Sequence, residues 1–272
     1  MYRARLRLKM KGMAPPRWST VSWPALRAGV GAMLVAVFAV ACGREPAAPP
    51  AARTPAPAAV APAAPPAAAP APAPAASSRP RIVFLGDSLT AGYGLEKSQA
   101  VPALIQARLD KDRYSFEVVN AGVSGDTSAG GLSRLEWSLS GDVRILVVEL
   151  GANDGLRGLP VAAMRRNLEE IITRAKARGI AVLLVGMEAL PNYGASYTSE
   201  FRDTFPALAK AHKIALMPFY LDGVAGNPAL NISDGMHPNQ AGAVIVADNL
   251  WRTLEPLLMA AAQAPAQTSG SR

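Results

Sequence analysis

Beyond residue 81, apolar runs of strand length alternate with longer stretches whose apolar residues recur at helical spacing. The runs are apolar at consecutive positions, which is typical of parallel strands covered on both faces. Strands alternating with helices predict an α/β fold, a doubly wound three-layer α/β/α sandwich around a five-stranded parallel sheet. The expected strands are residues 82–85, 116–120, 143–150, 181–185 and 214–218. The expected helices are residues 98–110, 128–138, 161–178, 199–212 and about 239–258.

The N-terminal 42 residues have the layout of an export signal. They contain seven basic residues and no acidic one, and an apolar run covers 28–41. This run is too short and too rich in alanine for a membrane span. Cys42, the only cysteine of the chain, follows it directly, so no intramolecular disulfide is possible. This arrangement resembles the lipobox of bacterial lipoproteins, which implies cleavage of the signal and lipid attachment at Cys42. Ordinary cleavage after residues 39–41 and an uncleaved anchor are the alternatives.

The basic character of the chain belongs to this leader. The formal net charge is +8, but without the seven basic residues of the leader the basic and acidic residues nearly balance. A nucleic-acid partner therefore has little support. Residues 43–80 are almost all alanine and proline, which predicts a disordered, extended linker. We thus expect a signal peptide at 1–42, a linker at 43–80, the working domain at 81–260 and a flexible tail at 261–272.

Four polar blocks follow the expected strands or precede the last expected helix. Gly-Asp-Ser-Leu follows the first strand and contains Ser88, and residues 121–126 follow the second. Residues 151–155 follow the third strand, and residues 234–238 precede the last helix. In doubly wound folds the site lies beyond the carboxyl ends of the strands, so the fold would gather these blocks at one edge.

Ser88 is the candidate nucleophile, and a serine needs an adjacent base to attack at neutral pH. The chain has two histidines, of which His212 lies in a helical stretch among lysines and alanines. His237 comes three residues after Asp234, a spacing that lets the carboxylate bond one ring nitrogen while the other faces the site. We therefore expect Ser88, His237 and Asp234 to form a catalytic triad.

An oxyanion formed at Ser88 would need hydrogen-bond donors. We expect the backbone N–H of Ser88, the backbone N–H of Gly122 and the side-chain amide of Asn153 to supply them. Ser124 is a poor rival nucleophile, because its G-x-S-x-G pattern is broken by Asp126.

Together the blocks resemble the SGNH, or GDSL, hydrolase family. Ser88, Gly122, Asn153 and His237 match its four named residues, and Asp234 matches its triad acid. The resemblance covers residues 81–258 and implies a flavodoxin-like fold and a serine hydrolase. It is strongest for the subgroup of bacterial periplasmic thioesterases that are also described as lysophospholipases and arylesterases.

The resemblance also implies a substrate and a pocket. The substrate would be an acyl ester or thioester, and the candidate walls of its pocket are Leu156, Leu159, Pro191 and Tyr193. A carbohydrate O-deacetylase of the same family and a non-enzymatic tethered binding module are the alternatives. We expect no metal and no cofactor, because the chain has neither a His/Cys cluster nor a phosphate-binding loop. We expect an exported monomer in the periplasm or cell envelope, held at a membrane through Cys42.

Overall fold

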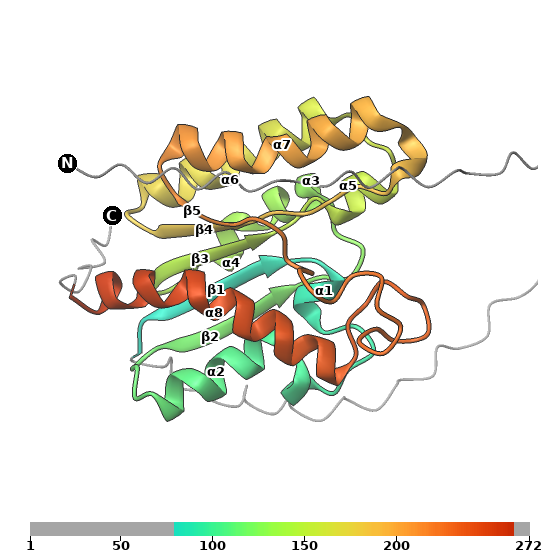
Figure 1. Ribbon diagram of the computed structural model, residues 1–272. Coiled ribbons are helices and arrows are strands. Elements are labelled where there is room, and N and C mark those ends of the chain that lie inside the picture. The colour runs from blue at the N-terminus through green and yellow to red at the C-terminus, as the bar shows by residue number, and fades with distance from the viewer. Residues whose placement is uncertain (1–78, 264–272) are drawn as a thin grey trace, which may run out of the picture. The chain divides into compact units, whose positions relative to one another are not determined.

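The structure, a computed structural model that describes residues 79–263, is built on a five-stranded sheet in the order β2-β1-β3-β4-β5, with every pair parallel (Figure 1). This confirms the expected fold class. The strands are β1 Arg81–Gly86, β2 Glu117–Gly122, β3 Val143–Glu149, β4 Ala181–Val185 and β5 Ala215–Met217. The chain passes from β1 to β2 on one side and returns to β3 on the other, so the strand order reverses at β1. Ligand sites of such sheets lie at the carboxyl edge of this reversal.

Helices cover both faces of the sheet. Figure 1 shows α2 and α8 on one face and α6 and α7 on the other. The helices are α1 Ser88–Ala91, α2 Val101–Lys111, α3 Ser128–Ser133, α4 Leu135–Ser138, α5 Ala152–Leu156, α6 Val161–Ala177, α7 Ala195–His212 and α8 Gln240–Gln263, with short 3-10 helices η1 Lys97–Gln99 and η2 Pro191–Tyr193. Within the described residues, no helix is both long enough and apolar enough to cross a bilayer.

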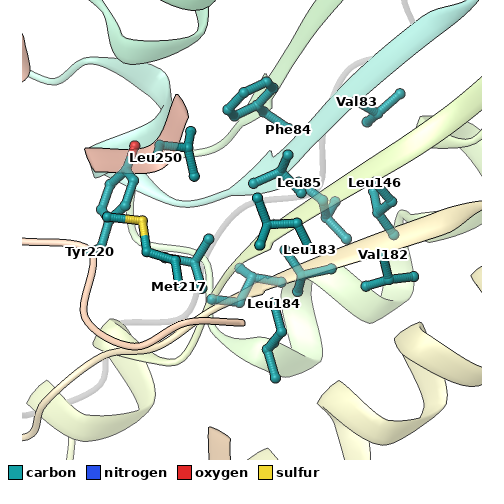
Figure 2. Packing of buried hydrophobic residues seen from close by; sticks show 14 of the residues in the cluster. Val83, Phe84, Leu85, Leu146, Val182, Leu183, Leu184, Met217, Tyr220 and Leu250 are labelled. Atoms are coloured by element: carbon teal, nitrogen blue, oxygen red, sulfur yellow. The ribbon is translucent and has the colours of Figure 1, made fainter. Parts of the chain in front are cut away.

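The core forms where the apolar runs of the central strands meet the helices. Every residue of β3 is buried, as expected for a strand covered on both faces. Figure 2 shows side chains of β1, β3, β4 and β5 packed together with Tyr220 and with Leu250 of α8. The buried residues of α6 recur at helical spacing, and that apolar stripe faces the sheet. The packed core therefore makes the sheet a rigid platform for the loops at its carboxyl edge.

Most expected elements are present with somewhat different bounds, and three differences go further. The helix expected at 128–138 is two short helices that meet at Arg134, whose side chain reaches across to the strand ends. The last helix continues to Gln263, so residues 261–263 are helical where we expected tail, and Ala261 and Ala262 favour that extension. The short helix α5 was not expected, because five residues give too little periodic pattern to detect. The leader, Cys42 and the linker up to residue 78 lie outside the described residues.

Candidate active site

Ser88 lies where β1 ends and α1 begins. Asp87 precedes it and caps α1, because Asp87 Oδ1 accepts a hydrogen bond of 2.9 Å from the Leu89 N–H. This cap fixes the backbone on both sides of Ser88. The Ser88 Oγ lies 2.8 Å from the His237 Nε2, across 149 positions of the sequence.

His237 is oriented by Asp234, which lies in the same loop before α8. The His237 Nδ1 is 2.6 Å from the Asp234 Oδ2. The Asp234 Oδ1 accepts the backbone N–H groups of His237 at 3.0 Å and of Met236 at 2.9 Å. The backbone bond from His237, with that from Met236 and the imidazole, lowers the pKa of Asp234 to about 2, against a smaller opposing effect of burial. Asp234 is therefore ionised at neutral pH and can stabilise an imidazolium.

Asn153 joins the loops after three strands. It lies in α5, just beyond β3, and its Nδ2 donates to the Asp87 Oδ2 at 3.0 Å and to the Asp126 carbonyl oxygen at 2.9 Å. These two bonds hold the loop that carries Ser88 and the loop that follows β2 at a fixed distance from α5. They also occupy both N–H groups of the amide.

Gly122 is placed differently from our expectation. Its N–H donates to the Asn120 Oδ1 at 2.9 Å, and Gly122 is not part of the cavity wall next to Ser88. A Cβ at this position would lie 2.3 Å from the Ala91 backbone nitrogen. Gly122 therefore serves the close approach of β2 to α1, and its N–H is not available to an oxyanion at Ser88.

Gly125 occupies the place that we expected Gly122 to fill. It lines the cavity beside Ser88, and its φ of 85° is in the left-handed region that favours glycine. Its carbonyl oxygen accepts a bond of 2.7 Å from the Arg157 Nη2. In the described part of the chain, the N–H groups of Gly125 and Ser88 have no hydrogen-bond acceptor. Both can therefore bind an anionic oxygen.

A cavity of ≈ 560 Å³ opens beside Ser88 and His237. Its lining is mostly apolar, and its volume is in the range of small-molecule sites. Among its apolar residues are Leu89, Tyr93, Ala152, Leu156, Met187, Ala189, Leu190, Phe219, Leu221, Ala225 and Met236.

The expected pocket walls agree only in part with this lining. Leu156 lines the cavity, but Leu159, Pro191 and Tyr193 do not. The Tyr193 hydroxyl instead donates to the Leu156 carbonyl oxygen at 2.9 Å, so Tyr193 supports the wall from behind. In the loop after β4, the neighbouring Leu190 faces the cavity.

Other titratable residues near the site or in the sequence blocks, and the second histidine, have structural partners. The His212 Nε2 lies 3.2 Å from the Glu169 Oε1, and Asp126 pairs with Arg134. Asp154 accepts bonds of 2.7 Å from both the N–H and the hydroxyl of Ser128. Within residues 79–263, no three His, Cys, Asp or Glu side chains are grouped as a metal site would require.

A comparison with protein-family models matches residues 84–245 to the GDSL-like Lipase/Acylhydrolase family. The chain belongs to this family. The match includes Ser88, Asn153 and His237, and the chain is accordingly an ester-hydrolysing enzyme.

Similar proteins carry related names. The chain is 46% identical over 178 residues to "Esterase TesA" of Pseudomonas aeruginosa, covering 65% of this chain and 89% of that protein. It is 39% identical over 178 residues to "Thioesterase 1/protease 1/lysophospholipase L1" of Escherichia coli K12, covering 65% and 84%. A crystal structure of TesA superposes with a TM-score of 0.63 at 44% identity, covering 65% of this chain and 99% of that one. The fold and the family resemblance expected from the sequence are thereby confirmed.

Several residues that line the cavity were not predicted from the sequence. Tyr93, which follows α1, places its ring 4.7 Å from the His237 ring, centroid to centroid. Met187 and Phe219 follow β4 and β5 and also line the cavity. In the sequence, only their positions could have indicated a role, because each lies just after a strand or just after α1, the helix that begins at Ser88.

Proposed function

We propose that the chain is a serine esterase that hydrolyses acyl esters or thioesters through Ser88, His237 and Asp234. One observation carries the proposal. Hydrogen bonds of 2.8 and 2.6 Å join the hydroxyl of Ser88, the imidazole of His237 and the carboxylate of Asp234 in one series, and Ser88 and His237 line a mostly apolar cavity. A serine activated by an oriented imidazole is suited to acyl transfer.

In the acylation step, the Ser88 Oγ attacks the acyl carbonyl carbon while its proton passes to the His237 Nε2. Asp234 holds the ring by its other nitrogen and stabilises the positive charge that forms. Collapse of the tetrahedral intermediate breaks the bond to the leaving group, and His237 returns the proton to the departing alcohol or thiol. In the second step, His237 takes a proton from water as the water oxygen attacks the acyl carbon. His237 then returns the proton to the Ser88 Oγ as the bond between Ser88 and the acyl carbon breaks and the acid leaves.

The negative oxygen of each intermediate needs donors in place before the reaction. We assign this role to the N–H groups of Ser88 and Gly125, which are free of protein acceptors among the described residues. Asn153 is the third candidate. Because both of its N–H groups already have acceptors, an oxyanion would share one of them with Asp87 or with Asp126.

The cavity favours an acyl chain as the recognised part of the substrate. Apolar side chains such as Leu156, Met187 and Phe219 would surround a chain, whereas a sugar would leave its hydroxyls without partners along that wall. Relatives named esterase, arylesterase and thioesterase/lysophospholipase support the same substrate class. The O-deacetylase alternative predicts instead that activity is highest on acetyl esters.

The test is hydrolysis of p-nitrophenyl esters from acetyl to palmitoyl by the protein and by two variants. Ser88→Ala should lose activity by several orders of magnitude, while Ser124→Ala, a serine on the same cavity wall with no histidine partner, should retain turnover. A fluorophosphonate probe should label the peptide that contains Ser88. Equal turnover by the protein and Ser88→Ala would overturn the mechanism, and an optimum at acetyl would favour the deacetylase.

We also propose that the hydrolase domain at 81–260 is exported and held by a lipid at Cys42 through the linker at 43–80. The support is the basic and apolar leader, the single cysteine directly after it, and the alanine- and proline-rich segment that follows. The mass of the N-terminal peptide of the mature protein tests this. An acylated Cys42 supports the anchor, and an unmodified N-terminus near residue 42 would refute it.

A further inference from the structure

Two carboxyl side chains lie buried behind the nucleophile, and the mechanism above gives them no chemistry. Asp87 precedes Ser88, and Glu149 ends β3, where it is the strand partner of Gly86; each residue is 1% exposed. The Glu149 Oε2 accepts bonds from the Thr90 hydroxyl at 2.8 Å and from the Asp87 N–H at 3.3 Å. The side chains of Asp87 and Glu149 are also within hydrogen-bonding reach of each other. The pair therefore lies directly beneath the turn that presents Ser88.

The fold makes room for this pair. A Cβ on Gly86 would lie 2.0 Å from the Thr90 Oγ1 and 2.7 Å from the Glu149 Oε2. The glycine before Asp87 thus leaves space that the hydroxyl and the carboxyl occupy. A group placed so closely beneath the nucleophile turn cannot move without moving the turn.

The surroundings of Asp87 and Glu149 do not stabilise negative charge on both carboxyls at once. Within residues 79–263, neither carboxyl forms an ion pair with an arginine or lysine, and the Glu149 Oε1 is buried with no hydrogen-bond partner. The groups that face the pair are the Thr90 hydroxyl, the buried Tyr220 phenol and, toward Asp87, the His237 imidazole. Burial raises the pKa of Asp87 to about 6, and burial together with the charge of Asp87 raises the pKa of Glu149 well above 4.5.

We propose that Glu149 keeps its proton in the folded enzyme and shares it in a hydrogen bond with Asp87, so that Glu149 is a positioning residue for both Ser88 and Asn153. The inference rests on the proposed function, because it concerns the same site. In this arrangement Asp87 accepts a hydrogen bond from the protonated Glu149, and it also accepts hydrogen bonds from the Leu89 N–H and the Asn153 amide. The hydrogen bond from protonated Glu149 therefore holds Asp87 in the position from which it orients both the turn at Ser88 and the side-chain amide of Asn153.

The proposal gives the site a pH dependence of defined sign. The folded protein holds this proton more tightly than the unfolded chain does. The unfolding free energy therefore falls as pH rises from the ordinary glutamate value of 4.5 toward the raised pKa of the folded state. For one proton the slope is about a tenfold change in the unfolding constant per pH unit. Loss of the proton also places two negative charges in contact, which would displace Asp87 and lower kcat.

The experiment compares Glu149→Gln, Glu149→Ala and the control Glu170→Gln, which alters a glutamate on α6 whose side chain is 46% exposed. Glutamine keeps a neutral donor toward Asp87 at every pH. We expect Glu149→Gln to lose far less kcat than Glu149→Ala, which should fall by about a hundredfold with a smaller change in KM. We also expect Glu149→Gln to shift the alkaline limb of kcat to higher pH, and Glu170→Gln to leave that limb in place.

A second readout does not depend on turnover. The infrared spectrum of the protein at neutral pH should contain a C=O band from a buried carboxylic acid, which Glu149→Gln lacks and Glu170→Gln retains. In urea unfolding, the midpoint should fall less with rising pH for Glu149→Gln than for the unmodified protein. Absence of both differences would overturn the shared proton. Should Ser88→Ala retain full esterase activity, the proposed function would fail, while the infrared and urea measurements would still decide the protonation of Glu149.

Discussion

Arg134 connects three parts of the site from outside the cavity, and its removal should cost both stability and rate. Its Nε lies 2.6 Å from the Asp126 Oδ2, its Nη1 donates to the Ala121 carbonyl oxygen at 2.6 Å, and its Nη2 donates to the Gly86 carbonyl oxygen at 2.9 Å. Gly86 and Ala121 lie at the carboxyl ends of β1 and β2. One guanidinium therefore holds two strand ends and the loop that carries Gly125.

The size of the effect follows from the burial of this ion pair. The side chain of Arg134 is 17% exposed and that of Asp126 is 19% exposed. Removing one partner of a fully buried pair costs about 3–5 kcal/mol, because the other charge stays buried and unpaired. Since about a fifth of each side chain still reaches water, we expect Arg134→Met to lower the unfolding free energy by about 2–4 kcal/mol. We expect kcat to fall more than KM rises, because the strand ends carry the nucleophile and a proposed oxyanion donor.

Urea unfolding of the protein, Arg134→Met and Arg174→Met measures this. Arg174 pairs with Glu170 on α6, but both side chains are nearly half exposed, so its loss should cost less than about 1 kcal/mol. A double-mutant cycle with Asp126→Asn should recover a coupling of about 1–3 kcal/mol between Arg134 and Asp126. If Arg134→Met and Arg174→Met were equally stable, the argument from burial would be refuted.

Two further predictions concern the triad acid and the cavity. Hydrogen bonds hold the pKa of Asp234 at about 2 in the folded protein, below its ordinary 3.8, so its stabilising contribution is complete above that ordinary value and is lost as pH falls through 2. Asp234→Asn should therefore weaken the dependence of the urea midpoint on pH over this acid range. The control is Asp222→Asn, which alters an exposed aspartate after β5 and should leave that dependence in place. An unchanged dependence in Asp234→Asn would contradict the assignment. Ala189→Phe adds a ring to the cavity wall and should lower kcat/KM for long-chain esters by about tenfold or more while sparing acetyl esters. Equal loss on all chain lengths would show that the acyl chain does not pass Ala189.

Sequence reasoning reached the parts of the site that follow from topology. Parallel strands bring their carboxyl ends to one edge, so residues just after β1 and β3 had to lie near each other. Ser88 and Asn153 are such residues. His237 could be joined to them because a histidine three positions from an aspartate is a recognisable unit.

Features that depend on the exact course of a loop were not accessible in this way. Gly122 and Gly125 lie three positions apart and look equally suitable, but a side chain, Asn120, takes the N–H of the first, and only the turn at Gly125 faces the cavity. Leu190 and Tyr193 show the same limit, because a 3-10 helix directs one into the cavity and the other behind its wall. Such distinctions are decided by tertiary contacts, which leave no periodic pattern in the sequence.

Glu149 shows a different limit of sequence reasoning, because its buried environment could not be predicted. In the sequence it is a polar residue at the end of an apolar run, with nothing to separate it from a solvated strand end. The structure gives two carboxyls of the same site opposite environments. Asp234 receives backbone N–H groups and stays charged, whereas Glu149 is buried without a cation, which favours its neutral form. The charge that stabilises His237 and the neutral donor that aligns Asp87 therefore do not compete for one proton. The charged Asp234 orients the triad and the neutral Glu149 orients the proposed oxyanion donors over the same range of pH.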